Sequence, residues 1–272
     1  MALPGPQDQF ITIDGQNIRY IEFGKGRPVI VLHQLAVYGS ADHWRPYSQD
    51  LAAAGRIYAL DMPGWGRSSM PPTGYSFDMW INVIRGFCDA KGLAVVDLFA
   101  MSLGAWICAL FASEHPGRVR RMALLDCPGL NPALRAYASD TFALPSREDI
   151  RRISVYDAAL ADAIYDAMNQ PGRREAYIEI LRYVGDPDVR QRWSLRERLP
   201  EMPMPMLFTN YDTDTAIPVE YTLEAFQLAP VARLSITATG FGRKAADIYG
   251  EHVDTGIEFL TKPEILPARR RG

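Results

Sequence analysis

The sequence predicts an α/β protein with a doubly wound, mostly parallel sheet and a helical lid insertion. Short and almost uniformly apolar runs alternate with helical segments, which is typical of strands that are covered on both faces. This alternation stops after residue 130 and resumes at residue 204. We therefore expect an α/β core formed by residues 1–130 and 204–272, and a helical lid formed by residues 131–203.

The first strands are expected as a hairpin over Phe10–Gly24, because Asp14-Gly15 suits a turn that needs positive φ. Ser76 is placed to cap one of the following helices, and Gly92 is placed to end it. The strands and helices expected next are, in chain order, Pro28–His33, His43–Ala54, Arg56–Leu60, Phe77–Ala90, Val95–Ala100, Leu103–Ser113 and Val119–Leu125.

The inserted segment is helical and polar-faced, and Ser146-x-x-Asp149 forms the pattern of a capping box. It carries an apolar stripe at i, i+4 spacing that consists of Tyr156, Leu160, Ile164 and Met168. We interpret this stripe as core packing rather than as a cofactor site. Strands return at Met206–Thr209 and Ala232–Ala238, and a last helix runs to Leu260.

Composition narrows the function classes. The chain has 272 residues, 29 Lys+Arg, 32 Asp+Glu and a formal net charge of −3, and 48% of its residues are hydrophobic. A chain of this kind can bury a large core without staples. Its strongly basic run, Arg269-Arg270-Arg271, is too short to follow a phosphate backbone. We expect a small-molecule substrate, with neither nucleic acid nor a membrane as partner, and the sequence is compatible with a homodimer.

The cysteines Cys88, Cys108 and Cys127 stand about twenty residues apart, which gives neither a C-x-x-C pair nor an even-numbered disulfide framework. We expect buried, reduced thiols. The N-terminal residues contain two prolines and lack the apolar run of a signal peptide. A cytoplasmic location is the expectation that follows.

The most specific motif is Ala100-Met101-Ser102-Leu103-Gly104, which lies between an apolar strand and an apolar helix. This is the context of a nucleophile elbow, a strained turn that holds a serine hydroxyl above the sheet. Residues 100 and 104 must be small because the helix packs closely against the strand. The start of the helix supplies free N–H groups, so that the N–H of Leu103 is a natural oxyanion donor.

With this motif the chain resembles the α/β-hydrolase fold family, in its serine-nucleophile branch, over about residues 10 to 260. Residues 61–68, DMPGWGRS, are similar to that family's D-x-P-G-x-G-x-S loop. His33-Gln34-Leu35 stands where the family usually has His-Gly-x, which implies that the Leu35 N–H completes the oxyanion hole. In that family His33 is commonly structural, whereas Gln34 could alter the pocket.

The resemblance also implies a catalytic acid. Asn210–Pro218 resembles the family's G-x-x-D-x-x-x-P segment, in which Asp214 is the acid that orients a histidine. Asp126, at the end of the preceding strand, is the alternative acid. Asp212 is expected to be a turn residue.

The histidine of the family's triad is missing from its usual place. It normally follows the last strand in a Gly-His pair, and here Gly240-Phe241 puts Phe241 in that slot, or Arg243 in another register. Neither side chain can act as a general base near neutral pH. The alternative bases are His252, which we expect at an exposed position of the last helix, and His43, whose loop would have to fold inward.

Four interpretations stay open. The first is a serine hydrolase in which the histidine was lost naturally or by engineering, and it is favoured because the other elements persist. The second is a non-hydrolytic enzyme, such as a lyase, cyclase or decarboxylase, that uses the same pocket and oxyanion hole. The third is a ligand-binding protein without turnover, and the fourth is an intact hydrolase that recruits His252 or His43.

The expected substrate is a small, largely apolar or aromatic carbonyl compound with an ester, thioester, amide or C–C bond to be cleaved by Ser102. The aromatic residues of the lid favour such a ligand. Candidate pocket residues are His33, Gln34, Met101 and Trp193. No metal and no cofactor are indicated, because the histidines and carboxylates lack ligand spacing and no phosphate-binding loop is present.

Overall fold

A computed structural model describes residues 5–132, 143–153, 155–240 and 243–262. Its centre is an eight-stranded sheet with the order β1-β2-β4-β3-β5-β6-β7-β8. The strands are β1 (Asp8–Ile13), β2 (Gln16–Gly24), β3 (Pro28–Leu32), β4 (Arg56–Leu60), β5 (Val96–Met101), β6 (Val119–Leu125), β7 (Met206–Tyr211) and β8 (Ala232–Thr237). Only β2 is antiparallel to both of its neighbours, β1 and β4, and the pairs from β4 to β8 are all parallel.

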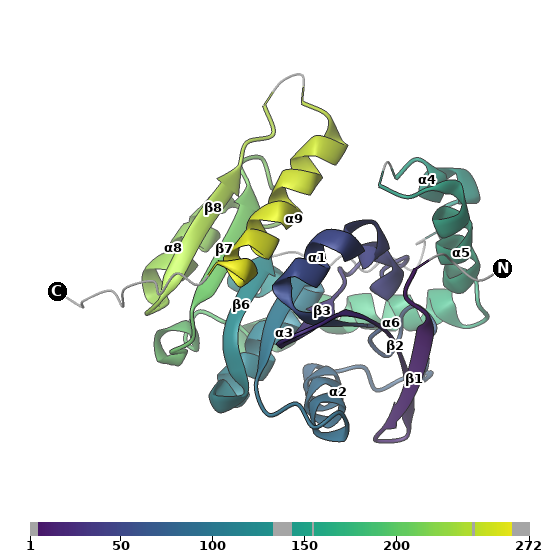
Figure 1. The fold of residues 1–272 in the computed structure, drawn as a ribbon, viewed down its shortest axis with the longest axis horizontal. Helices are drawn as coiled ribbons and strands as arrows, with labels where there is room; N and C mark the ends of the chain where they lie inside the picture. Colours follow the sequence, from purple (N-terminus) through teal and green to yellow (C-terminus); the bar gives the residue numbers. More distant parts are fainter. Residues whose placement is uncertain (1–4, 133–142, 154, 241–242, 263–272) are drawn as a thin grey trace.

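Helices cover both faces of the sheet (Figure 1). The α-helices are α1 (Ser48–Ala54), α2 (Phe77–Ala90), α3 (Leu103–Glu114), α4 (Arg147–Arg151), α5 (Ala158–Met168), α6 (Arg173–Gly185), α7 (Pro187–Arg192), α8 (Val219–Leu228) and α9 (Ala245–Thr261). Short 3-10 helices are η1 (Ala41–Tyr47), η2 (Pro116–Arg118), η3 (Pro128–Leu130) and η4 (Leu199–Glu201). The doubly wound α/β architecture expected from the alternating pattern is thereby confirmed.

Side-chain alternation along the strands divides the core into two parts. In β3, Ile30 and Leu32 belong to the apolar cluster shared with α2 and α3, whereas Val29 and Val31 belong to the cluster shared with α1 and α9. Successive residues of a strand point to opposite faces, so a run without polar residues serves both clusters. The three cysteines are free and buried, as expected.

The predicted elements lie within a few residues of the observed ones. Asp14 and Gly15 both have positive φ, 47° and 78°, at the expected hairpin turn. Ser76 caps α2 through its side chain, which accepts a hydrogen bond from the N–H of Met79 at 3.1 Å. The expected helix over residues 43–54 is instead a 3-10 helix followed by the short helix α1, and Pro46 lies within the first of them.

The helices α4 to α7 are inserted between β6 and β7. Ser146 and Asp149 form the expected capping box of α4. The stripe Tyr156, Leu160, Ile164 and Met168 is buried, as core packing requires. That this segment acts as a lid stays a prediction, and its residues 133–142 and 154 lie outside the described part of the chain.

A buried ionic network fixes the loop of residues 61–68. Asp61 accepts hydrogen bonds from the N–H groups of Ala41 at 2.6 Å and Arg67 at 2.7 Å, and it pairs with the buried Arg19 at 3.2 Å. A Cβ on Gly66 would lie only 1.9 Å from Asp61 Oδ2, so glycine is required there. This loop is therefore a structural part of the strand-end region.

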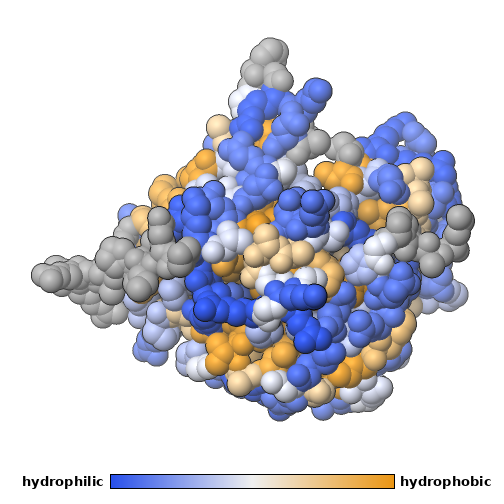
Figure 2. Space-filling view, viewed as in Figure 1, coloured by the Kyte–Doolittle hydropathy of each residue, from blue (hydrophilic) through white to orange (hydrophobic). Residues whose placement is uncertain are grey.

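The surface is mixed in polarity. Figure 2 shows mostly hydrophilic residues with scattered hydrophobic groups on the face drawn. In the described part of the chain, none of the helices combines the length and the apolar character needed to cross a membrane.

Candidate functional site

The site is built at the carboxyl ends of the parallel strands. Ser102 follows β5 directly and begins the turn into α3, with φ 54° and ψ −127°. A residue other than glycine in this conformation is strained, and such strain persists where the surroundings enforce it. The packing behind it is close: a Cβ on Gly104 would already lie 2.5 Å from the carbonyl oxygen of His33, and a larger side chain would clash further. These are the features of the elbow predicted from the sequence.

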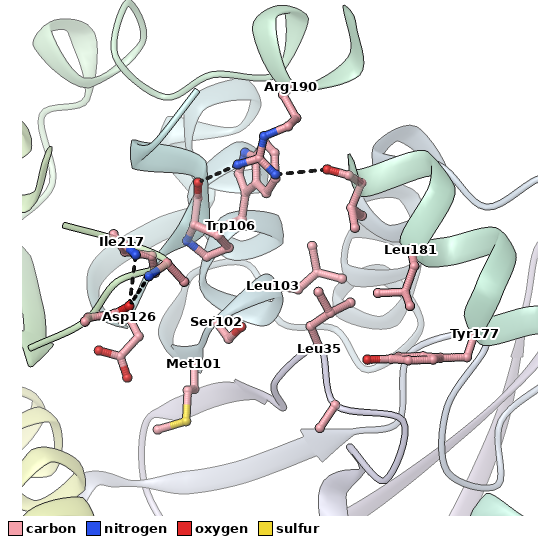
Figure 3. A pocket seen from close by; sticks show the side chains of 15 residues that line it. Leu35, Met101, Ser102, Leu103, Trp106, Asp126, Tyr177, Leu181, Arg190 and Ile217 are labelled. Atoms are coloured by element: carbon pink, nitrogen blue, oxygen red, sulfur yellow. Dashed lines mark hydrogen bonds between the residues drawn. The ribbon is translucent and has the colours of Figure 1, made fainter. Parts of the chain in front are cut away.

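Ser102 lies at the wall of a cavity of about 460 Å³. Figure 3 shows Asp126 and Met101 on one side of Ser102, and Leu35 and Leu103 on the other. The lining is mostly apolar and consists of Leu35, Ala36, Met101, Ser102, Leu103, Trp106, Asp126, Pro128, Tyr177, Leu181, Val184, Arg190, Asp214, Ala216 and Ile217. A cavity of this size and polarity suits a small organic molecule.

The two expected oxyanion donors belong to the same wall. Leu103 is the first residue of α3, where backbone N–H groups have no partner within the helix. Leu35 also lines the cavity beside Ser102. The structure thus brings Ser102, Leu103 and Leu35 to one cavity wall, and the oxyanion hole formed by the two N–H groups stays a prediction.

Asp214, the predicted acid, lines the cavity from the loop after β7. Its Oδ1 accepts hydrogen bonds from the N–H groups of Ala216 at 2.7 Å and Ile217 at 2.9 Å, so that this carboxylate oxygen closes a turn. No histidine of the described residues forms a hydrogen bond to it. Asp212 lies in a turn, as expected, and its Oδ1 accepts the N–H of the distant Thr239 at 2.8 Å.

Asp126, the alternative acid, follows β6 and also lines the cavity. Its φ is 50°, so Ser102 and Asp126 both leave neighbouring strands with a positive φ. Burial raises the pKa of its carboxyl, His252 lowers it, and the charge of Asp214 raises it further. Asp126 is therefore a partly buried carboxylate that lines the same cavity as Ser102.

His252 is fully buried on α9, so its expected exposed position is wrong. It belongs to the face of α9 that packs on the sheet, and Gly256, one turn later, lets the helix come so close that a Cβ there would lie 2.6 Å from Phe99. His252 Nε2 lies 2.7 Å from Thr209 Oγ1 and 3.1 Å from Asp126 Oδ1. The alternative acid and the alternative base are thus brought together, although neither was expected beside the other.

His43, the second alternative base, is buried away from the cavity lining. Its Nδ1 lies 2.5 Å from the hydroxyl of Tyr156, and its Nε2 forms a hydrogen bond with the hydroxyl of Tyr249. Burial lowers the pKa of His43 to about 3. The Tyr249 hydroxyl donates in turn to Met101 Sδ at 3.3 Å, so this cluster supports the residue before Ser102.

Ser102 Oγ has no hydrogen-bond partner among the described residues, and neither His43 nor His252 reaches it. Phe241 lies outside the described residues, so its place in the histidine slot stays a prediction.

The comparisons with known proteins agree with this architecture. A family model described as the alpha/beta hydrolase fold matches residues 27–227. The chain belongs to the alpha/beta hydrolase fold family.

The chain is 29% identical over 238 residues to a 2-hydroxy-6-oxo-2,4-heptadienoate hydrolase of Pseudomonas putida F1. The aligned residues cover 82% of this chain and 83% of that hydrolase. The chain is 28% identical over 216 residues to a 2-hydroxymuconate semialdehyde hydrolase of a Pseudomonas species, with 74% and 75% covered. A solved meta-cleavage product hydrolase mutant matches with a TM-score of 0.70 and 25% identity over 92% of this chain and 98% of that one.

Of the four pocket candidates of this alpha/beta hydrolase, His33, Gln34 and Trp193 are not among the cavity-lining residues. His33 accepts the N–H of Met62 at its Nε2, at 3.3 Å, and its Nδ1 lies 2.9 Å from the carbonyl oxygen of Gln34, so both ring nitrogens face backbone groups. Gln34 turns its amide toward His43, at 3.3 Å. The carbonyl of Trp193 accepts from Trp106 Nε1 at 2.8 Å, which puts Trp193 behind the wall. Of the four candidates, Met101 is the one among the cavity-lining residues.

The sequence did not reveal Arg190 of α7, which is buried and lines the cavity beside Trp106. Its guanidinium lies 5.4 Å from the centre of the Trp106 ring and donates to the carbonyl oxygens of Val184 at 3.1 Å and Asn131 at 2.7 Å (Figure 3 shows Arg190 above Trp106). An arginine on an amphipathic helix has no local pattern that marks it as buried, because its burial depends on η3 folding beneath it. Within the described residues, no three His, Cys, Asp or Glu side chains gather as a metal site would require.

Proposed function

We propose that this alpha/beta hydrolase cleaves a small, largely apolar carbonyl compound that carries a carboxylate, with Ser102 as nucleophile. The observation that carries the proposal is the strained elbow of Ser102 at the wall of an apolar cavity, beside the first N–H groups of α3. An N–H pair from Leu103 and Leu35 would hold the oxyanion formed when Ser102 Oγ attacks a carbonyl carbon.

Of the three charged residues in the cavity lining, Asp126, Asp214 and Arg190, the arginine is the one that supports a carboxylate on the substrate. Arg190 brings a guanidinium to a cavity whose lining is mostly hydrophobic. A positive charge in surroundings of low dielectric attracts an anion more strongly than it would in water. The first relative named above is a hydrolase of a heptadienoate, a carboxylate with a second carbonyl group. We extend that substrate class, a carboxylate-bearing compound with a C–C bond next to a carbonyl, to this chain.

The missing histidine belongs to the proposal. We infer that the triad histidine is replaced at Phe241 and that no histidine serves Ser102, since both nitrogens of His43 and His252 face other partners. Cytoplasmic location and a homodimeric state remain predictions from the sequence.

The first test measures turnover of 2-hydroxy-6-oxo-2,4-heptadienoate by the loss of its absorbance. The second test measures labelling of the protein by a fluorophosphonate. We expect slow turnover and labelling in the parent, and neither in Ser102→Ala. We expect Arg190→Gln to raise KM for this carboxylate roughly 10-fold or more, because a hydrogen bond to a charged group is worth about 1.5–3 kcal/mol. A neutral aryl acetate is the matched control, and its KM should stay within about 2-fold.

A second candidate is a non-hydrolytic reaction in which a carboxylate of the cavity moves a substrate proton, and Asp126, whose pKa is raised by burial, favours it. Ser102→Ala distinguishes the two. Turnover that survives in Ser102→Ala would contradict the hydrolase proposal and favour the second candidate. Binding of the heptadienoate without any product would favour a ligand-binding protein.

A further inference from the structure

Ser102 and Asp126 occupy equivalent places on neighbouring strands. In the parallel register of β5 and β6, Met101 pairs with Leu125, and the N–H of Ser102 donates to the carbonyl of Leu125 at 2.8 Å. Ser102 and Asp126 are therefore the next residues on two strands about 4.8 Å apart. Both side chains line the same cavity (Figure 3).

Asp126 is held at this place by an unusual backbone. Ser102 and Asp126, with φ of 54° and 50°, are two of the three non-glycine residues with positive φ among the described residues, and the third is Asp14 in the exposed hairpin turn. Aspartate tolerates this conformation better than most residues, but it is still disfavoured relative to the extended form. The conformation directs the carboxylate to the cavity rather than along the sheet.

The hydrogen bonding of Asp126 is incomplete. Its Oδ1 is buried and has no well-aligned hydrogen-bond donor among the described residues. His252 Nε2 is close, at 3.1 Å, but is also only 2.7 Å from Thr209 Oγ1. A buried acceptor without a partner is rare in folded proteins and calls for a reason. A proton that arrives during the reaction would satisfy it.

His252 is fixed behind Asp126 on three sides. Its Nδ1 lies 3.3 Å from Thr237 Oγ1, its Nε2 faces Thr209 and Asp126, and the ring of Tyr211 stacks on it with centroids 4.4 Å apart. The imidazole therefore cannot turn toward Ser102 without losing these contacts. It can, however, act on Asp126.

We propose that Asp126 is the catalytic proton acceptor of this site and that His252 is its positioning residue. The usual order, in which a carboxylate orients a histidine that faces the serine, is reversed. This assignment rests on the proposed function, because it supplies the base that Ser102 needs.

The chemistry is balanced without a further reactant. The Ser102 Oγ–H bond breaks as Oγ bonds to the substrate carbonyl carbon, the proton moves to Asp126, and the π electron pair moves to the oxygen held by the backbone N–H groups. When the tetrahedral adduct collapses, the bond to the leaving group breaks and the leaving carbon or heteroatom takes the proton from Asp126. Water then repeats the sequence on the acyl group and returns Ser102 Oγ–H.

Asp214 is the competing carboxylate of the cavity. Its Oδ1 already accepts hydrogen bonds from two backbone N–H groups, those of Ala216 and Ile217. Protonation of the Asp214 carboxylate would weaken these two hydrogen bonds. Asp126 Oδ1 has no such commitment among the described residues. The comparison assigns the proton to Asp126.

Five titratable groups interact with Asp126 in the described part of the chain: His252 and Tyr249 of α9, Tyr211 of β7, Asp214 of the loop after β7, and the neighbouring Cys127. Burial raises the Asp126 pKa and His252 lowers it. A base must be deprotonated, so reactivity of Ser102 should rise with pH through the Asp126 pKa. Loss of His252 should move that rise to higher pH.

The experiment measures the rate of Ser102 phosphonylation by a fluorophosphonate as a function of pH, by intact mass. Asp126→Asn should lower the plateau rate by roughly 10²–10⁴-fold, the usual contribution of a general base, and should abolish the rise with pH. His252→Gln, which can still bond Thr209, should keep most of the plateau rate and shift the rise to higher pH. Asp254→Asn, the same change at an exposed position of α9, is the matched control and should behave as the parent.

The outcomes are separable. A parent that labels and turns over, with Asp126→Asn unchanged, overturns this inference and leaves the proposed function standing. Loss of the pH-dependent rise in Asp214→Asn instead of Asp126→Asn also overturns it. A parent without labelling or turnover contradicts the proposed function and the inference together. A His252→Gln rate that falls at all pH values without a shift contradicts the positioning role.

Discussion

The molecule buries two histidines near α9, and they differ in what surrounds them. His43 bonds to Tyr249 of α9, to Tyr156 of the inserted segment and to the side-chain amide of Gln34, so its hydrogen-bond partners carry no charge. His252 lies three residues after Tyr249 and faces two threonine hydroxyls and a carboxylate, that of Asp126. Burial and hydroxyl partners are common to both, and the carboxylate is found at His252.

This difference determines what each histidine can do. His43 has hydroxyl partners that accept or donate but do not stabilise a positive charge, and its pKa is lowered to about 3. It stays neutral and supports Met101 through Tyr249. His252 lies against the carboxylate of the cavity, so it can affect proton transfer at the site. A buried histidine is therefore assigned a role from its neighbours rather than from its burial.

The largest effect is expected from an additional histidine at position 241. Phe241→His restores a base at the position where the family resemblance expects one. We expect the rate of Ser102 phosphonylation and of aryl ester hydrolysis to rise by roughly 10²–10⁴-fold, the usual contribution of a general base. Steady-state kinetics with a short aryl ester measure the change.

Phe241→Gln is the matched control, since it makes the position polar without supplying a base, and its rate should stay near that of the parent. The double variant Phe241→His, Ser102→Ala should be inert. An inert Phe241→His in a folded protein would contradict the assignment of Phe241 to the histidine slot.

The fold was largely predictable because it depends on local patterns. Uniformly apolar runs such as Val119–Leu125 indicated buried parallel strands, and the Ser102 elbow followed from the small residues beside it. The site was less predictable, because its residues meet through long-range packing. Asp126 and His252 were each considered as alternatives, but their contact depends on the depth at which α9 packs on the sheet, which Gly256 permits.

The next effect is the contribution of His43 to the pH dependence of the free energy of unfolding. The pKa of His43 is about 3 in the folded protein, against an ordinary value of 6.5. Above pH 6.5 both states are neutral at this site, and the contribution to stability is fully present. Below it the unfolded chain takes up a proton that the folded protein does not, so stability is lost as pH falls from about 6.5 to about 3.

At about 1.4 kcal/mol per pH unit, this site should cost the parent about 2 kcal/mol between pH 8 and pH 5. His43→Gln, which can still bond both tyrosine hydroxyls, should lack this loss although it is less stable at pH 8. Urea unfolding of both proteins at pH 8, 6.5 and 5 gives the difference. Parallel pH curves for the two proteins would show that His43 is protonated in the folded state.

Arg190 is a cavity residue that could not be predicted from the sequence. Its position on α7 gave no sign of burial, since Asp186, Asp188 and the arginines around it are typical of a solvated helix. It lines the cavity because η3 and the end of α6 offer carbonyl oxygens to its guanidinium. The contact with Asn131 joins positions 59 residues apart, and no local spacing encodes it.

The smallest effect compares the two tyrosines that bond His43. Tyr249 donates to Met101 Sδ, so its oxygen accepts from Nε2–H of His43, and the unprotonated Nδ1 accepts from Tyr156. Tyr249→Phe leaves the buried Nε2–H without an acceptor and should lower the free energy of unfolding by about 1–3 kcal/mol. Tyr156→Phe should cost less, because the Gln34 amide lies 3.3 Å from the same Nδ1 and can replace the lost donor. Urea unfolding at pH 8 measures both, and an equal or reversed order would contradict this tautomer of His43.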